Sequence, residues 1–145
     1  MLAKKITYVN YNDEEVTETF YFNLSKAELT EMEFTTEGGL KTRLESISEK
    51  KDRKEIMNVF KGVIVKAYGE KSPDGKYLDK GENDSLGKRF TNSAAYDVLI
   101  MELFSSEKVA ADFFAAIMPK DIIEKAKKEG LIDNEGLPAV SANNA

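Results

Sequence analysis

The sequence of 145 residues contains no cysteine and no histidine. Without cysteine, the chain can form no disulfide, no thiolate nucleophile and no zinc–thiolate site. Without histidine, it lacks the usual general base of enzymes and the commonest transition-metal ligand. Because these two absences exclude most hydrolase mechanisms, we expect a protein that is not an enzyme, with no catalytic residues, no cofactor and no metal site.

Long apolar runs are also missing. No segment approaches the roughly 20 apolar residues that a membrane-spanning helix needs, and the N-terminal segment has no apolar run of signal length. The 21 Lys and Arg residues are outnumbered by 26 Asp and Glu, and the net charge of −5 repels the phosphates of nucleic acids. We therefore expect a cytoplasmic protein that binds neither membranes nor nucleic acid.

The acidic residues form no recognisable catalytic or metal-binding arrangement. Glu102 has the most apolar sequence neighbours, but it lies off the apolar stripe of its helix and is expected to be solvated. A calcium loop starting at Asp79 would need glycine at the sixth position and glutamate at the twelfth, where this chain has Asp84 and Phe90. A phosphate loop fails too, because five residues separate Gly81 from Gly87. The segment 69–92 is accordingly predicted to be a flexible loop.

The N-terminal part of the chain alternates between apolar and polar residues with a period of two. This pattern covers residues 4–22 and is interrupted only by the polar cluster Asn12 to Glu15. Its β-branched and aromatic residues suit strands, so the pattern predicts a β-hairpin. Because an isolated hairpin is marginally stable in water, one of its faces should pack on the rest of the protein or pair with another chain.

Helical patterns begin directly after this hairpin. Ser25 followed by Glu28 forms a capping box, which predicts a helix that begins at Lys26 and ends near residue 34. A weaker amphipathic pattern spans 40–47. The next helix, of about 16 residues, is predicted by an unbroken apolar stripe that Gly69 ends; its residues are Ile56, Val59, Phe60, Val63, Ile64, Ala67 and Tyr68.

The most apolar stretch runs from Phe90 to Pro119 and holds two helical patterns joined by a short Ser-Ser turn. The first stripe consists of Tyr96, Leu99, Ile100, Leu103 and Phe104. The second consists of Val109, Ala110, Phe113, Phe114, Ile117 and Met118. So short a link predicts two nearly antiparallel helices.

A last helix should start at Pro119 and end at Gly130, followed by a mobile C-terminal tail over 133–145. The predicted fold class is α+β and mainly α, with an N-terminal β-hairpin packed on a small bundle of about five helices. We expect a single domain, 1–132, with the hairpin within 4–22 and the helices within 26–129.

The two helices of the 90–119 stretch carry more apolar surface than one contact face needs. Core packing is the simplest account of each residue singly, but the excess as a group predicts an exposed surface for protein binding or self-association. The residues that make up this excess are Tyr96, Val98, Ile100, Met101, Phe113 and Phe114.

Four segments together carry a resemblance to a known family. They are the hairpin start KKITY, the segment FYFNLSKAELTEMEF (20–34), the helix end VIVKAYGEKSPDGK (63–76) and the segment AYDVLIMELFSSEKVAADFFAAIMP (95–119). In these segments the chain resembles the small tail assembly chaperones of tailed phages and prophages of Gram-positive bacteria. The segment 77–88 departs from the shorter basic stretch of that family.

The resemblance implies a helper in the host cytoplasm that binds the tape measure protein and keeps it soluble while the tail tube polymerises. It implies partner contacts at Tyr96, Ile100, Phe104, Phe113 and Phe114. The major tail protein and a second copy of the chain are further candidate partners, and the tail after residue 133 would suit a frameshift junction. Two alternatives stay open, a small structural subunit of the phage tail or capsid and an acidic inhibitor of a host protein.

Overall fold

The computed structural model describes residues 1–35 and 53–128. Two long strands form an antiparallel hairpin, β1 (Leu2–Val9) and β2 (Glu15–Phe22), with the register running from Leu2 opposite Phe22 to Val9 opposite Glu15. Two short strands, β3 (Tyr68–Lys71) and β4 (Leu78–Asp79), extend the sheet in the order β1-β2-β3-β4. The predicted hairpin is confirmed.

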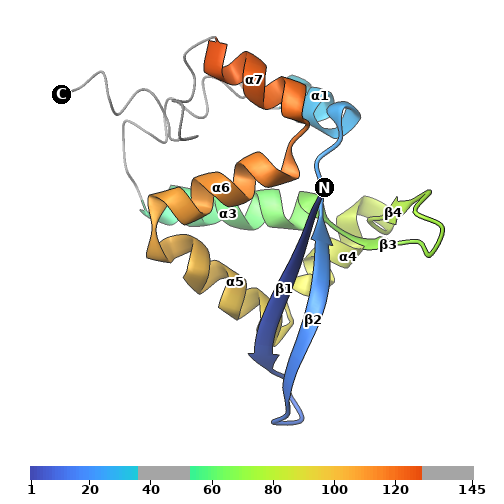
Figure 1. Ribbon diagram of the computed structural model, residues 1–145, viewed down its shortest axis with the longest axis vertical. Coiled ribbons are helices and arrows are strands. Elements are labelled where there is room, and N and C mark those ends of the chain that lie inside the picture. The colour runs from blue at the N-terminus through green and yellow to red at the C-terminus, as the bar shows by residue number, and fades with distance from the viewer. Residues whose placement is uncertain (36–52, 129–145) are drawn as a thin grey trace.

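The helices of the described residues lie beside the hairpin and beyond its end opposite the turn (Figure 1). They are α1 (Lys26–Thr35), α3 (Arg53–Ala67), the 3₁₀ turn η1 (Glu82–Asp84), α4 (Ser85–Phe90), α5 (Ala94–Ser105), α6 (Glu107–Ile117) and α7 (Lys120–Lys128). The predicted α+β, mainly α fold is confirmed. The predicted pattern over 40–47 and the tail over 133–145 lie outside the described residues.

The capping box predicted for α1 is present in both directions. The Glu28 backbone N–H donates to Ser25 Oγ at 3.1 Å, and the Ser25 N–H donates to Glu28 Oε1 at 3.0 Å. The residues just before this cap tie the hairpin to two helices, because the Asn23 N–H donates to the carbonyl of Ala67 and the Leu24 N–H to that of Ile117. The start of α1 is therefore fixed to the C-terminal ends of both α3 and α6.

The prediction of a flexible loop over 69–92 is wrong. This segment contains most of β3, all of β4, η1 and α4, and Gly69 lies within β3 instead of capping a helix. The strands are too short to show a period, and their pairing is set by backbone contacts with β2 and with each other. At Gly87, a Cβ atom would lie 1.9 Å from the carbonyl oxygen of Val65, so only glycine lets α4 pack against α3 this closely.

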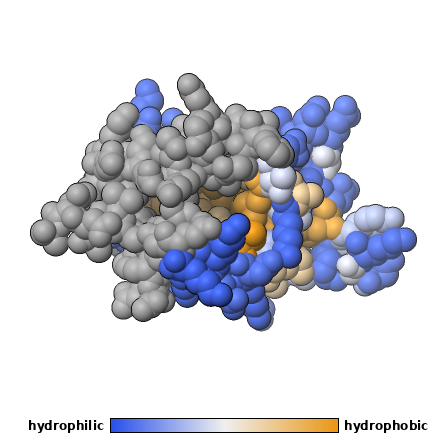
Figure 2. Space-filling view, turned by 90° about the horizontal axis from the view of Figure 1, so that it is seen from above, coloured by the Kyte–Doolittle hydropathy of each residue, from blue (hydrophilic) through white to orange (hydrophobic). Residues whose placement is uncertain are grey.

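The core lies between the inner face of the hairpin and the helices. Phe22, which is completely buried, is in its centre, with ring centroids at 5.8 Å from Tyr68, 5.6 Å from Phe90 and 5.4 Å from Phe113. Seen from above, a patch of hydrophobic residues is visible beside hydrophilic ones (Figure 2). Residues from the hairpin, α3, α4, α5 and α6 thus share one core.

Candidate protein-binding surface

Helix α5 is apolar around most of its circumference. Its inner side buries Ala95, Tyr96, Leu99, Ile100 and Leu103. Its other side exposes Val98 by 38%, Met101 by 70% and Phe104 by 42%, and we call these three residues the α5 outer face. A helix that is hydrophobic on all sides is usually buried on all sides, so this exposed apolar face is suited to a contact with another protein.

Local capping fixes where α5 begins and where α6 follows. The Ser93 hydroxyl accepts a hydrogen bond from the N–H of Tyr96 at the start of α5. The Ser106 hydroxyl accepts from the N–H groups of Lys108 and Val109 at the start of α6. A single residue, Ser106, separates the two helices, which turn back on each other at this point (Figure 1).

Helix α5 also packs along β1, and an ion pair connects the two elements. Lys4 Nζ lies 3.0 Å from Glu102 Oε1, and both side chains are partly exposed. Glu102, which the sequence predicts to be a solvated acid, thus holds the helix to the hairpin at the edge of the α5 outer face. The Glu102 carboxylate lies at the surface and pairs with a lysine, as is typical of an ion pair that stabilises the fold.

Phe104 connects the α5 outer face to a second apolar contact. Its ring centroid lies 5.1 Å from that of Phe60 on α3, and Phe60 in turn lies 5.0 Å from Phe114 on α6. Phe60 and Phe114 are only partly buried. Three helices therefore bring one aromatic ring each to the same part of the surface.

The structure separates the five predicted partner-binding residues into two groups. Phe104 is exposed and Phe114 is half-buried, whereas Tyr96, Ile100 and Phe113 belong to the buried core. Met101 and Val98, which were part of the predicted apolar excess but not of the predicted contacts, are on the surface. The sequence could have indicated this exposed face, because Val98, Met101 and Phe104 share one side of an ideal helix. Partner contact by the five residues stays a prediction.

Tyr96 has an unusual environment within this core. Its side chain is buried, and its hydroxyl has no hydrogen-bond partner among the described residues. Burial, and secondarily the negative charge of Asp97, raises the pKa of the Tyr96 hydroxyl above its usual value. The apolar packing of the ring thus outweighs the cost of an unpaired hydroxyl.

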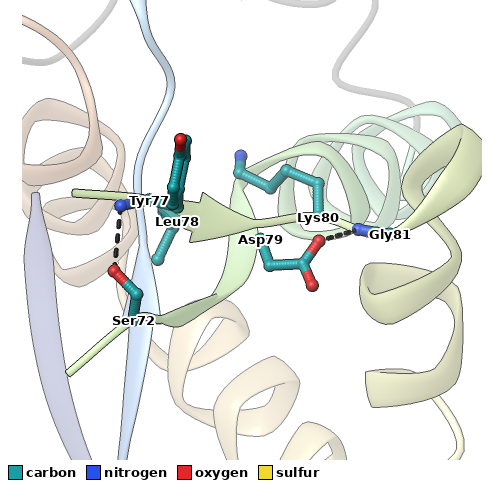
Figure 3. A pocket seen from close by; sticks show the side chains of 6 residues that line it. All are labelled: Ser72, Tyr77, Leu78, Asp79, Lys80 and Gly81. Carbon is teal, nitrogen blue, oxygen red and sulfur yellow. Dashed lines mark hydrogen bonds between the residues drawn. The ribbon is translucent and has the colours of Figure 1, made fainter. Parts of the chain in front are cut away.

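A shallow hollow of about 490 Å³ lies at the turn between β3 and β4 (Figure 3). Its polar groups already bind one another, since the Tyr77 N–H donates to Ser72 Oγ and the Gly81 N–H donates to Asp79 Oδ1. The Lys80 ammonium donates to the carbonyls of Asn23 and Lys66 and to the Glu28 carboxylate. The hollow therefore offers few free polar groups to a ligand.

Within residues 1–35 and 53–128, no three acidic side chains gather closely enough to hold a metal ion. In the same part of the chain, no helix is both long enough and apolar enough to cross a membrane. The α5 outer face is thus the candidate site that the described residues support best.

Residues 1–145 match the model of the family described as "Phage tail assembly chaperone". Searches of curated proteins and of solved structures found no significant match.

Proposed function

Since this chain belongs to the phage tail assembly chaperone family, we propose that it binds the tape measure protein of its phage in the host cytoplasm. In this role it keeps that protein soluble while the tail tube polymerises. The observation that carries the proposal is the α5 outer face, where Val98, Met101 and Phe104 are exposed on a helix whose opposite side is already in the core.

The α5 outer face is suited to an apolar helical partner. Amphipathic helices dock by laying apolar side chains, spaced three or four residues apart, against a complementary apolar surface. Val98, Met101 and Phe104 have this spacing, and the neighbouring rings of Phe60 and Phe114 extend the surface onto α3 and α6. Phe104 and Phe114 are the predicted contact residues that a partner can reach directly, while Tyr96, Ile100 and Phe113 hold the two helices in place from within the core.

The net charge of the chain supports a solubilising role. A chaperone that covers an apolar segment of a client must itself keep the complex dispersed, and a net charge of −5 opposes association between complexes. The proposed role needs binding and release only, and no chemical step. Contacts with the major tail protein and with a second copy of the chain belong to the same proposal.

The experiment is an affinity pull-down of the tagged protein during phage production, with mass spectrometry of the bound fraction and of purified phage particles. We expect the tape measure protein in the bound fraction and this chain to be absent from finished particles. Recovery of the chain in particles at stoichiometric amounts would instead identify a structural subunit of the tail or capsid.

A further inference from the structure

The outer edge of β2 is only partly occupied. Strand β3 pairs with Tyr21 and Phe22 alone, and then turns away to pair with β4. No strand of the described residues pairs with the stretch of β2 from 15 to 20 on this side. A strand edge of this kind presents free N–H and C=O groups to any extended chain that approaches it.

The hairpin turn shows which backbone groups of β2 point to that edge. The Asn10 N–H donates to the carbonyl of Glu14 at 2.9 Å, so the carbonyl of Glu14 faces β1, whereas the Asn23 N–H faces the other edge, where it donates to the carbonyl of Ala67. Hydrogen-bonded and non-hydrogen-bonded pairs alternate along an antiparallel ladder. Val16, Glu18 and Phe20 therefore direct their backbone groups to β1, and the residues between them, Glu15, Thr17 and Thr19, direct theirs to the free edge.

A groove of about 360 Å³ lies beside this edge, on the inner side of the sheet. Five aromatic side chains line it, namely Tyr8 of β1, Tyr11 of the hairpin turn, Phe20 of β2, Tyr68 of β3 and Phe90 of α4. Tyr68 and Phe90 are stacked, with ring centroids 4.5 Å apart. A strand added to β2 would direct alternate side chains to this side of the sheet, where the groove can hold a bulky apolar one.

Along the unpaired stretch of β2 itself, the charged residues are all acidic. The stretch from Glu14 to Glu18 contains three glutamates and no lysine or arginine. The charged residues that line the groove itself, Glu70 and Arg89, balance each other. The edge is therefore complementary to an extended segment that carries basic residues.

From this geometry we propose that the free edge of β2 is a second docking site, which binds an extended, basic segment of another protein by strand addition. One bulky apolar side chain of that segment enters the groove between Tyr8, Phe20, Tyr68 and Phe90, and its Lys or Arg residues lie near Glu15 and Glu18. A second copy of this chain is a poor occupant, because pairing two β2 edges would bring two sets of three glutamates together. The outer edge of β1 is a weaker site, since α5 packs along β1.

The site is tested with the full chain, labelled with ¹⁵N, and two seven-residue peptides in which valine alternates with lysine or with glutamate. The lysine peptide is expected to shift the amide signals of residues 15–19 and of Arg89, and the glutamate peptide is expected to leave them unchanged. Glu15→Lys should weaken binding of the lysine peptide by about two- to fivefold, whereas Glu124→Lys on α7 should not. Equal shifts with both peptides, shifts confined to α5, or no shifts would overturn the proposal.

Backbone pairing is tested separately from charge. Thr17→Pro removes an N–H that points to the free edge and should abolish binding, because proline cannot donate to an added strand. Thr17→Pro also removes the hydrogen bond of 2.8 Å between the Thr7 and Thr17 hydroxyls. The control is Thr7→Val, which removes this same hydrogen bond but leaves the β2 edge intact. The Thr7→Val variant should bind the lysine peptide normally. Equal loss in both variants, or normal binding by a folded Thr17→Pro variant, would contradict strand addition.

The two proposed sites can fail independently. Met101→Glu alters the α5 outer face and should leave binding of the lysine peptide unchanged, because Met101 does not line the groove. If Met101→Glu abolished binding of the lysine peptide, the peptide would be bound at α5, and the β2 edge would lose its assignment.

Discussion

Lys80 and Glu28, which are 52 residues apart in the sequence, form the ion pair that connects the β4–η1 segment to α1. Lys80 Nζ lies 3.0 Å from Glu28 Oε2, and the same ammonium donates to the carbonyl of Asn23 at 2.9 Å and to that of Lys66 at 2.6 Å. Only 16% of the Lys80 side chain is exposed. All three donors of the ammonium are used, so one side chain fixes the ends of β2, α1 and α3 to one another.

Replacing Lys80 by Met should therefore destabilise the fold. The Glu28 carboxylate and two carbonyls would lose their donor while remaining partly buried, which costs about 1–3 kcal/mol or more in the free energy of unfolding. Lys108→Met is the matched control, because Lys108 pairs with Asp112 at an exposed site where 61% of the lysine side chain is accessible. That change should cost about 0.5 kcal/mol or less. Urea unfolding of the two variants measures the difference, and equal stabilities would contradict the role of Lys80.

Two glycines should respond to alanine in opposite directions. Gly87→Ala places a methyl group 1.9 Å from the carbonyl oxygen of Val65, so α4 has to move away from α3 and the melting temperature should fall by several degrees. Gly62 lies inside α3 with no atom within 4 Å of its added Cβ, so Gly62→Ala should raise the free energy of unfolding by about 0.5–1 kcal/mol. Thermal melts that change in the same direction for both variants would be inconsistent with the close contact of α3 and α4.

The unpaired hydroxyl of Tyr96 predicts a stabilising substitution. Tyr96→Phe keeps the ring in the core and removes a buried hydroxyl that has no partner among the described residues. The free energy of unfolding should rise by about 1 kcal/mol. Calorimetry of the variant checks this value, and a clear loss of stability would show that the hydroxyl has a partner.

The hydrogen bond that Tyr8 donates to Glu18 should delay the ionisation of the Tyr8 hydroxyl to high pH. The Tyr8 hydroxyl donates to Glu18 Oε1 at 2.5 Å, and this hydrogen bond is the main reason why the pKa of Tyr8 is raised to about 12. Because the folded-state pKa exceeds the unfolded value of 10.0, this contribution to stability is complete below pH 10 and is lost as the pH rises towards 12. Ultraviolet titration of tyrosinate should show the Tyr8 transition move to lower pH in Glu18→Gln. An unchanged titration curve would refute the hydrogen bond.

The elements that the sequence predicts well are those with a long regular period or a specific cap. The hairpin, α3, α5 and α6 each repeat their pattern over eight or more residues, and α1 has a capping box that the structure reproduces. The segment 69–92 was missed because β3 and β4 have four and two residues. Strands that short are defined by the strands with which they pair. The need for glycine at position 87 likewise comes from a contact distant in sequence, with the backbone of Val65.

The candidate surface was only partly predictable for a related reason. The sequence identifies 90–119 as richer in apolar residues than one contact face needs, but it does not show which stripe is covered. Tyr96, Ile100 and Phe113 are covered by the hairpin and by neighbouring helices, and these long-range contacts leave Met101 and Phe104 at the surface. The role of Lys80 could not be predicted either, because its three acceptors come from distant parts of the sequence.

The most direct test of the proposed function is the affinity of Met101→Glu for the tape measure protein, measured after co-expression and by titration of the purified proteins. Tyr77→Glu is the control, because Tyr77 is also exposed, by 63% against 70% for Met101, but lies on the turn between β3 and β4. A charge in the middle of the α5 outer face should weaken binding by about tenfold or more and leave the tape measure protein insoluble, while Tyr77→Glu binds as the unmodified chain does. Undiminished binding and solubilisation by Met101→Glu would contradict the assignment of the α5 outer face as the chaperone surface.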